Sequence, residues 1–97
     1  MKTLEEVKAI LEANKDNLKE KYKIKTIGIF GSLVRGEQKR RSDIDILVDF
    51  EVTIGFFKFL EMEEYLSELV GTKVDLVSRK ALKPRIGKYI LQEVIQI

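Results

Sequence analysis

The segment 43–50, DIDILVDF, sets the strongest limit on the fold, because acidic and apolar side chains alternate along it. A period of two predicts a β-strand with one buried face and one partly open face. The apolar face would carry Ile44, Ile46, Val48 and Phe50, and the other face Asp43, Asp45 and Asp49. A chain with such a strand must cover its apolar face with other elements and leave its acids near solvent.

Helical and strand patterns alternate along the rest of the chain. Thr3 and Glu6 form a predicted capping box, and Pro84 suits the first turn of a helix. The predicted segments are a helix at 3–20, a strand at 24–30, a short helix from Ser32, a polar loop at 36–42, a strand at 43–50, a helix at 55–70 capped by Gly71, a strand at 73–78 and a helix from Pro84 to the end. This order predicts an α/β (α+β) fold, a small mixed sheet of three or more strands with helices packed on it.

Composition excludes several classes of enzyme. The 97 residues include no His and no Cys, so Ser-His-Asp or Cys-His catalysis and a zinc site built on thiolate or imidazole are ruled out. The size suits one domain, 1–97. No apolar stretch approaches the roughly 20 residues of a membrane span, and the first residues lack the apolar segment of a signal peptide. We therefore expect a cytoplasmic protein that does not bind membranes.

Three acids stand out as candidate metal ligands. Asp43 and Asp45 leave the same face of their strand about 6.6 Å apart, close enough to share a divalent ion. Asp75 interrupts the short apolar strand 73–78, where a charge is costly without a partner or a metal. If the two strands are neighbours, the three carboxylates can hold two Mg²⁺ ions around a phosphate. The alternative is an ordinary half-exposed strand; Asp49, about 13 Å further along, is left out of the site.

The sequence Gly31-Ser32 follows directly on the strand 24–30. A strand that stops at glycine and turns into a helix offers backbone N–H groups to a phosphate, and Ser32 could add its hydroxyl. A serine cap after a glycine turn explains the same residues. Four basic residues follow that could neutralise a polyphosphate or simply be solvated: Arg35, Lys39, Arg40 and Arg41.

The C-terminal segment suggests a protein contact. If 84–97 is one helix, Leu91 and Ile95 fall about 100–140° from its main apolar stripe. No other part of the chain obviously covers them, which predicts a homodimer or a helical partner. A broad stripe that faces the core is the alternative. The main stripe consists of Ile86, Ile90, Val94 and Ile97.

Together, these motifs resemble the DNA polymerase β-like nucleotidyltransferase superfamily. The resemblance rests on Gly31-Ser32, a spacer of ten residues, Asp43-Ile44-Asp45 and the later Asp75. The segments 31–37, 42–48, 73–77 and 81–84 resemble more closely its minimal nucleotidyltransferase (MNT) family. The resemblance covers roughly 24–97.

The resemblance implies an enzyme that binds ATP with Mg²⁺ and transfers AMP to a hydroxyl, releasing pyrophosphate. Many members of the family are antitoxins of HEPN toxins and adenylylate a toxin tyrosine. Carried over by position, the triphosphate contacts would be Gly31, Ser32 and Arg35, and the metal ligands Asp43, Asp45 and Asp75, with Asp75 also the base. Two alternatives stay open, a binding antitoxin without catalysis and transfer to a small molecule. Direct nucleic-acid binding is not expected, because no basic stripe with interleaved aromatic residues is visible.

Overall fold

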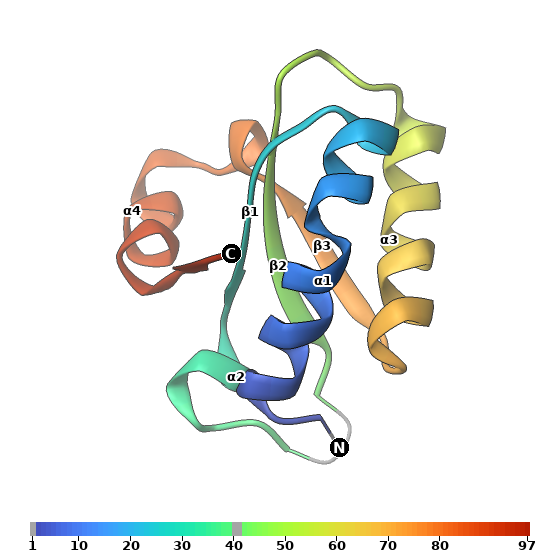
Figure 1. Ribbon diagram of the computed structural model, residues 1–97. Helices are drawn as coiled ribbons and strands as arrows, with labels where there is room; N and C mark the ends of the chain where they lie inside the picture. The colour runs from blue at the N-terminus through green and yellow to red at the C-terminus, as the bar shows by residue number, and fades with distance from the viewer. Residues whose placement is uncertain (1, 40–41) are drawn as a thin grey trace.

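The computed structural model describes residues 2–39 and 42–97. Two helices, α1 and α3, lie side by side on one side of a four-stranded sheet, and α4 lies on the opposite side (Figure 1). The elements are α1 (Leu4–Tyr22), β1 (Ile24–Phe30), α2 (Ser32–Arg35), β2 (Ile44–Phe50), α3 (Phe56–Val70), β3 (Val74–Ser78), the 3₁₀ turn η1 (Arg79–Ala81), α4 (Pro84–Glu93) and β4 (Ile95–Gln96). None of the helices within these residues is both long and apolar enough to cross a membrane.

The sheet is mixed, as predicted, with the strand order β3-β2-β1-β4. The central pair, β1 and β2, is antiparallel, and β3 runs parallel to β2. A parallel neighbour requires a crossover connection, which α3 supplies. The parallel pairing brings the starts of β2 and β3 to the same end of the sheet.

The core fills the space between the sheet and the helices α1 and α3. Ile44, Ile46 and Val48 are fully buried, so the apolar face predicted for 43–50 is confirmed. Thr3 forms the predicted capping box with Glu6 at the start of α1. Burial of these aliphatic side chains, at about 25 cal/mol per Å² of apolar surface, is the main favourable term that holds the helices on the sheet.

Side chains of α3 cover the outer edge of β3. The Glu63 Oε2 accepts the Leu76 N–H at 2.8 Å, and the Ser67 Oγ accepts the Val74 N–H at 2.9 Å. These two N–H groups point away from β2 and would otherwise lie unpaired at the edge of the sheet. Side chains of α3 therefore satisfy the outward-pointing N–H groups of β3.

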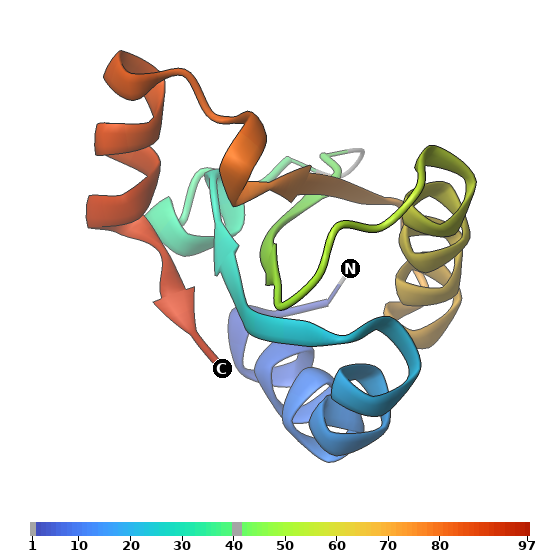
Figure 2. The ribbon, with the colours of Figure 1, turned by 90° about the horizontal axis from the view of Figure 1, so that it is seen from above.

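The C-terminal segment departs from the predicted helix. α4 ends at Glu93, and Val94 takes extended backbone angles (φ −59°, ψ 136°). The next two residues form β4, antiparallel to β1, with Ile95 opposite Ile29 (Figure 2). Gly28 permits this approach, because a Cβ there would lie 2.6 Å from the Val94 Cγ2. The open edge of β1 thus binds the segment that helical spacing assigned to α4.

The second helical stripe predicted for the C-terminal segment is therefore wrong. Ile95 lies half-buried in β4, whereas Leu91 stays on α4 with 41% of its surface exposed. The homodimer predicted through these two residues loses its geometric basis, because they no longer share a helix face. Ile97 packs against the core, and its N–H donates to the Ile27 carbonyl oxygen at 2.9 Å.

Candidate active site

Asp45 and Asp75 lie at matching positions on neighbouring strands. The parallel register pairs them directly, at the roughly 4.8 Å spacing of adjacent strands. Asp43 precedes β2, and its Oδ2 lies 3.7 Å from the Lys73 Nζ at the start of β3. The Ile44 N–H donates to the Lys73 carbonyl oxygen at 2.9 Å, which fixes the two strand starts to each other. The structure therefore places all three predicted acids at one end of the sheet.

The charge of these acids is poorly compensated. Burial, followed by the negative charges of Asp75 and Asp43, raises the pKa of Asp45 from 3.8 to about 6. The positive charge of Arg35 opposes this rise in the pKa but does not cancel it. A carboxyl group so perturbed carries an energetic penalty when it is ionised at neutral pH. A bound cation would remove that penalty.

A hard divalent cation suits this set of oxygen donors. Among residues 2–39 and 42–97, no three acidic side chains lie close enough together to hold a metal ion as they stand. Asp43 keeps 40% of its side-chain surface exposed, and Asp75 is exposed as well, so both can change rotamer. The negative charge of the three acids suits a cation, but their side chains would have to move closer together to coordinate it.

Gly31 brings the end of β1 against the acids. Phe30 is the register partner of Asp45, so the next residue lies beside the Asp45 side chain. Gly31 has φ 82° and ψ −154°, a region that is essentially restricted to glycine, and a Cβ there would overlap the Asp45 carboxylate. Ser32, half-buried, begins the four-residue α2. An anion at this turn would depend on local N–H groups and the Ser32 hydroxyl, because the helix is too short for a substantial dipole.

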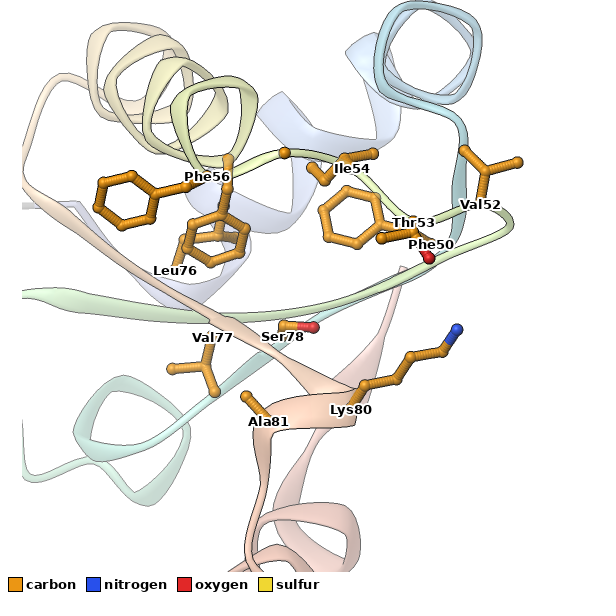
Figure 3. A pocket seen from close by; sticks show the side chains of 12 residues that line it. Phe50, Val52, Thr53, Ile54, Phe56, Leu76, Val77, Ser78, Lys80 and Ala81 are labelled. Carbon is orange, nitrogen blue, oxygen red and sulfur yellow. The ribbon is translucent and has the colours of Figure 1, made fainter.

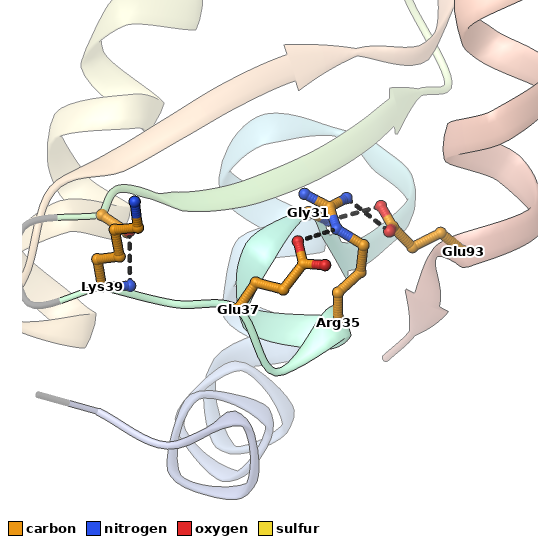
Figure 4. A network of polar contacts seen from close by, with 6 residues as sticks. Gly31, Arg35, Glu37, Lys39 and Glu93 are labelled. Carbon is orange, nitrogen blue, oxygen red and sulfur yellow. Dashed lines mark hydrogen bonds and ion pairs between the residues drawn. The ribbon is translucent and has the colours of Figure 1, made fainter.

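Arg35 lies between two carboxylates (Figure 4). Its Nε donates to the Glu37 Oε2 at 2.9 Å, and its Nη1 donates to the Glu93 Oε1 at 2.7 Å. The other oxygen of Glu93, Oε2, accepts the Gly31 N–H at 2.8 Å. One carboxylate from α4 therefore joins two residues that the sequence assigned to the triphosphate.

The polar loop after α2 is described only in part. Lys39 is exposed, and its N–H donates to the Ser42 Oγ at 2.9 Å. The Ser42 N–H in turn donates to the Lys39 carbonyl oxygen at 3.0 Å, which brings the two sides of the loop together. Arg40 and Arg41, the other two basic residues proposed to neutralise a polyphosphate, lie outside the described residues.

An apolar pocket of about 510 Å³ lies at the far end of β3 (Figure 3). Its wall includes Phe56 at the start of α3, Leu76 and Val77 of β3, and Ala81 of η1. None of the predicted site residues lines it, although Val77 is only two positions along the strand from Asp75. The pocket is therefore a neighbour of the acidic cluster and not part of it.

Comparison with known proteins decides the family, because the profile of the nucleotidyltransferase domain matches residues 9–97. The chain belongs to this nucleotidyltransferase family. It is 52% identical over 97 residues to the protein adenylyltransferase MntA of Thermococcus cleftensis, covering 100% of this chain and 98% of the relative. A solved structure described as a minimal nucleotidyltransferase is 33% identical with a TM-score of 0.84, over 99% of this chain and 97% of the other. A toxin–antitoxin structure with AMP-PNP is 28% identical with a TM-score of 0.74, over 93% and 70% of the two chains.

Glu93 is the residue of this nucleotidyltransferase that the sequence analysis missed. Helical spacing places it inside a long terminal helix, with no reason to face the turn at Gly31. One signal was available, since Glu93 is the only acidic residue in the basic segment 79–97. A single acid among five basic residues is a candidate for a specific ion pair, and the structure pairs it with Arg35.

Asp49 lies further along β2 than the three predicted site acids, opposite Thr26, whereas Asp45 is opposite Phe30. It is buried, and its Oδ2 lies 3.7 Å from the Arg79 Nη1. Its Oδ1 has no hydrogen-bond partner among the described residues. The ion pair with Arg79 gives Asp49 a structural explanation that does not involve Asp45 or Asp75.

Proposed function

We propose that this nucleotidyltransferase transfers AMP from ATP to a hydroxyl group of a cognate HEPN toxin and thereby acts as an antitoxin. The observation that carries the proposal is the register of Asp45 with Asp75, beside the glycine turn at Gly31. The relatives support the choice of donor and acceptor. One of them is a protein adenylyltransferase, and another is a toxin–antitoxin structure with AMP-PNP.

The residues take separate roles in this proposal. Asp43 and Asp45 would hold Mg²⁺, and Asp75 would be the third ligand. A metal held by these acids would supply positive charge to offset that of the triphosphate and of the pyrophosphate leaving group. Burial and the neighbouring charges of Asp75 and Asp43, which raise the pKa of Asp45, support cation binding at this cluster.

The transfer itself is an in-line displacement. The acceptor oxygen bonds to the α-phosphorus of ATP, the bond from that phosphorus to the bridging oxygen breaks, and pyrophosphate leaves with the bonding pair. Asp75 would accept the proton of the acceptor hydroxyl, because it is the most exposed of the three acids. Gly31, Ser32 and Arg35 would hold the triphosphate in place, which supplies the alignment that this reaction requires.

A protein acceptor suits the open form of the site. Asp75 lies exposed at the start of the edge strand β3, where a hydroxyl on the surface of another protein can reach it. The apolar pocket at the end of β3 contains none of the proposed catalytic acids.

The experiment that tests this function uses α-labelled ATP, Mg²⁺ and a HEPN toxin as the acceptor protein. We expect label on the HEPN protein with the wild type and none with Asp43→Asn/Asp45→Asn. Asp16→Asn, on the exposed face of α1, is the matched control and should label as the wild type does. Equal neutralisation of the toxin by the wild type and the double variant, with no label transferred by either, would refute AMP transfer and leave a binding antitoxin.

A further inference from the structure

We propose that Glu93 is a positioning residue of the triphosphate site, one that fixes the Gly31 backbone and the Arg35 guanidinium before the nucleotide arrives. The inference rests on the proposed function, because it takes these two residues as contacts of the triphosphate. It adds a residue on α4 to a site that the sequence placed wholly between residues 31 and 75.

The Glu93 carboxylate bridges Gly31 and Arg35. Its two oxygens are divided, with Oε2 on the Gly31 N–H at 2.8 Å and Oε1 on the Arg35 Nη1 at 2.7 Å. Its side chain keeps only 19% of its surface exposed, whereas the Glu37 side chain on the other side of the guanidinium keeps 64%. Glu93 is therefore the more strongly held of the two carboxylates that contact Arg35.

The C-terminal strand determines where Glu93 lies. Glu93 ends α4, and β4 begins two residues later. Ile95 pairs with Ile29, and Glu93 and Gly31 each lie two residues from this pair along their own segments. The strand pairing therefore places Glu93 level with Gly31. Val94 packs on Gly28, which prevents the segment from sliding away from the sheet. The two residues that follow Glu93 therefore anchor it next to Gly31.

Arg35 keeps donors for an anion while Glu93 holds it. A guanidinium has five N–H groups, and the contacts with Glu37 and Glu93 use two of them. Contacts on two sides fix the plane of the group, so less conformational freedom is lost when a phosphate binds. Gly31 gains in the same way, since its unusual backbone conformation is held by the N–H bond to Glu93 before any ligand is present.

Two other roles of Glu93 predict different effects of its removal on nucleotide affinity. If Glu93 occupied donors that the triphosphate needs, its removal would free the Gly31 N–H and the Arg35 Nη1 and tighten nucleotide binding. If Glu93 only stabilised the fold, its removal would lower the melting temperature and leave nucleotide affinity unchanged. Affinity measured beside stability separates these three roles.

The test compares Glu93→Ala, Glu93→Gln and the control Gln92→Ala, an exposed neighbour on α4. The dissociation constant of AMP-PNP with Mg²⁺ is measured by calorimetry, and kcat and KM for ATP are measured in the AMP-transfer assay. We expect Glu93→Ala to raise both Kd and KM roughly tenfold with kcat nearly unchanged. Glu93→Gln should recover part of the loss, because its amide oxygen still accepts the Gly31 N–H. Gln92→Ala should match the wild type.

The outcomes distinguish this inference from the proposed function. Unchanged or tighter AMP-PNP binding by Glu93→Ala would overturn the positioning role. A wild type that binds AMP-PNP but transfers no AMP would overturn the proposed function, and the Kd comparison would still decide the role of Glu93. A wild type that binds no AMP-PNP would overturn both. Exchange of the Gly31 amide proton, faster in Glu93→Ala than in Gln92→Ala, checks the tether without nucleotide.

Discussion

Substitution of Gly31 by alanine tests the contact between the glycine turn and the acids. Two penalties combine at this position. The backbone at φ 82° and ψ −154° costs an alanine up to about 3 kcal/mol. The added Cβ would also overlap the Asp45 carboxylate, so that side chain must rotate away. Gly36→Ala is the matched control, because Gly36 also has a positive φ (71°), but a Cβ there would meet no described atom within 4 Å beyond its chain neighbours.

The two variants should therefore differ in both stability and binding. Left-handed strain alone costs Gly36→Ala about 1 kcal/mol, or about 4–8 °C in Tm for a domain of this size. Gly31→Ala should lose about 12–24 °C, from about 3 kcal/mol on the same scale. Its affinity for AMP-PNP with Mg²⁺ should fall more than about tenfold, because Asp45 is displaced. Differential scanning calorimetry and titration calorimetry measure the two effects. Equal Tm and equal affinity in the two variants would refute the packing of Gly31 against Asp45.

Two further predictions concern Asp45 and the edge of β3. The folded protein binds the Asp45 proton more tightly than the unfolded chain does, so the free energy of unfolding should decline as the pH rises from about 4 to about 6. Solvent screening limits the size of this decline to about 1 kcal/mol, and Asp45→Asn should remove it. Mg²⁺ at pH 7.5 should raise the Tm of the wild type but not that of Asp45→Asn. Identical pH profiles of Tm for the two proteins would contradict this prediction. Glu63→Ala should lower stability by about 1–2 kcal/mol through the loss of its bond to the Leu76 N–H, and thermal melts should show no such loss for Glu64→Ala on the exposed side of α3.

The sequence predicts the first three strands and the first three helices to within two residues, because each carries a strong local signal. The alternation in 43–50 defines β2, and the capping box at Thr3 defines the start of α1. The position of Asp75 beside Asp45 is predictable for a physical reason. A charge inside a short apolar strand is costly without a partner or a metal, and a metal can be shared with the acids of a neighbouring strand.

The C-terminal strand and Glu93 are not predictable in the same way. The segment 94–97 carries apolar residues that suit both a helix and a strand, and local spacing cannot choose between them. The choice depends on the open edge of β1, more than sixty residues earlier in the chain, and on the space that Gly28 leaves there. Glu93 follows from that choice, since its carboxylate reaches Gly31 only when β4 is in place.

The cover that α3 gives to β3 also affects how this protein can meet other chains. An edge strand with free N–H groups is a template on which a foreign strand can grow, the usual route to fibres and swapped assemblies. Here Ser67 and Glu63 already accept the N–H groups of Val74 and Leu76. Another chain could extend the sheet at this edge only by displacing both side chains. A protein that approaches Asp75 along β3 would therefore have to recognise side chains, and this edge of the sheet is protected against polymerisation.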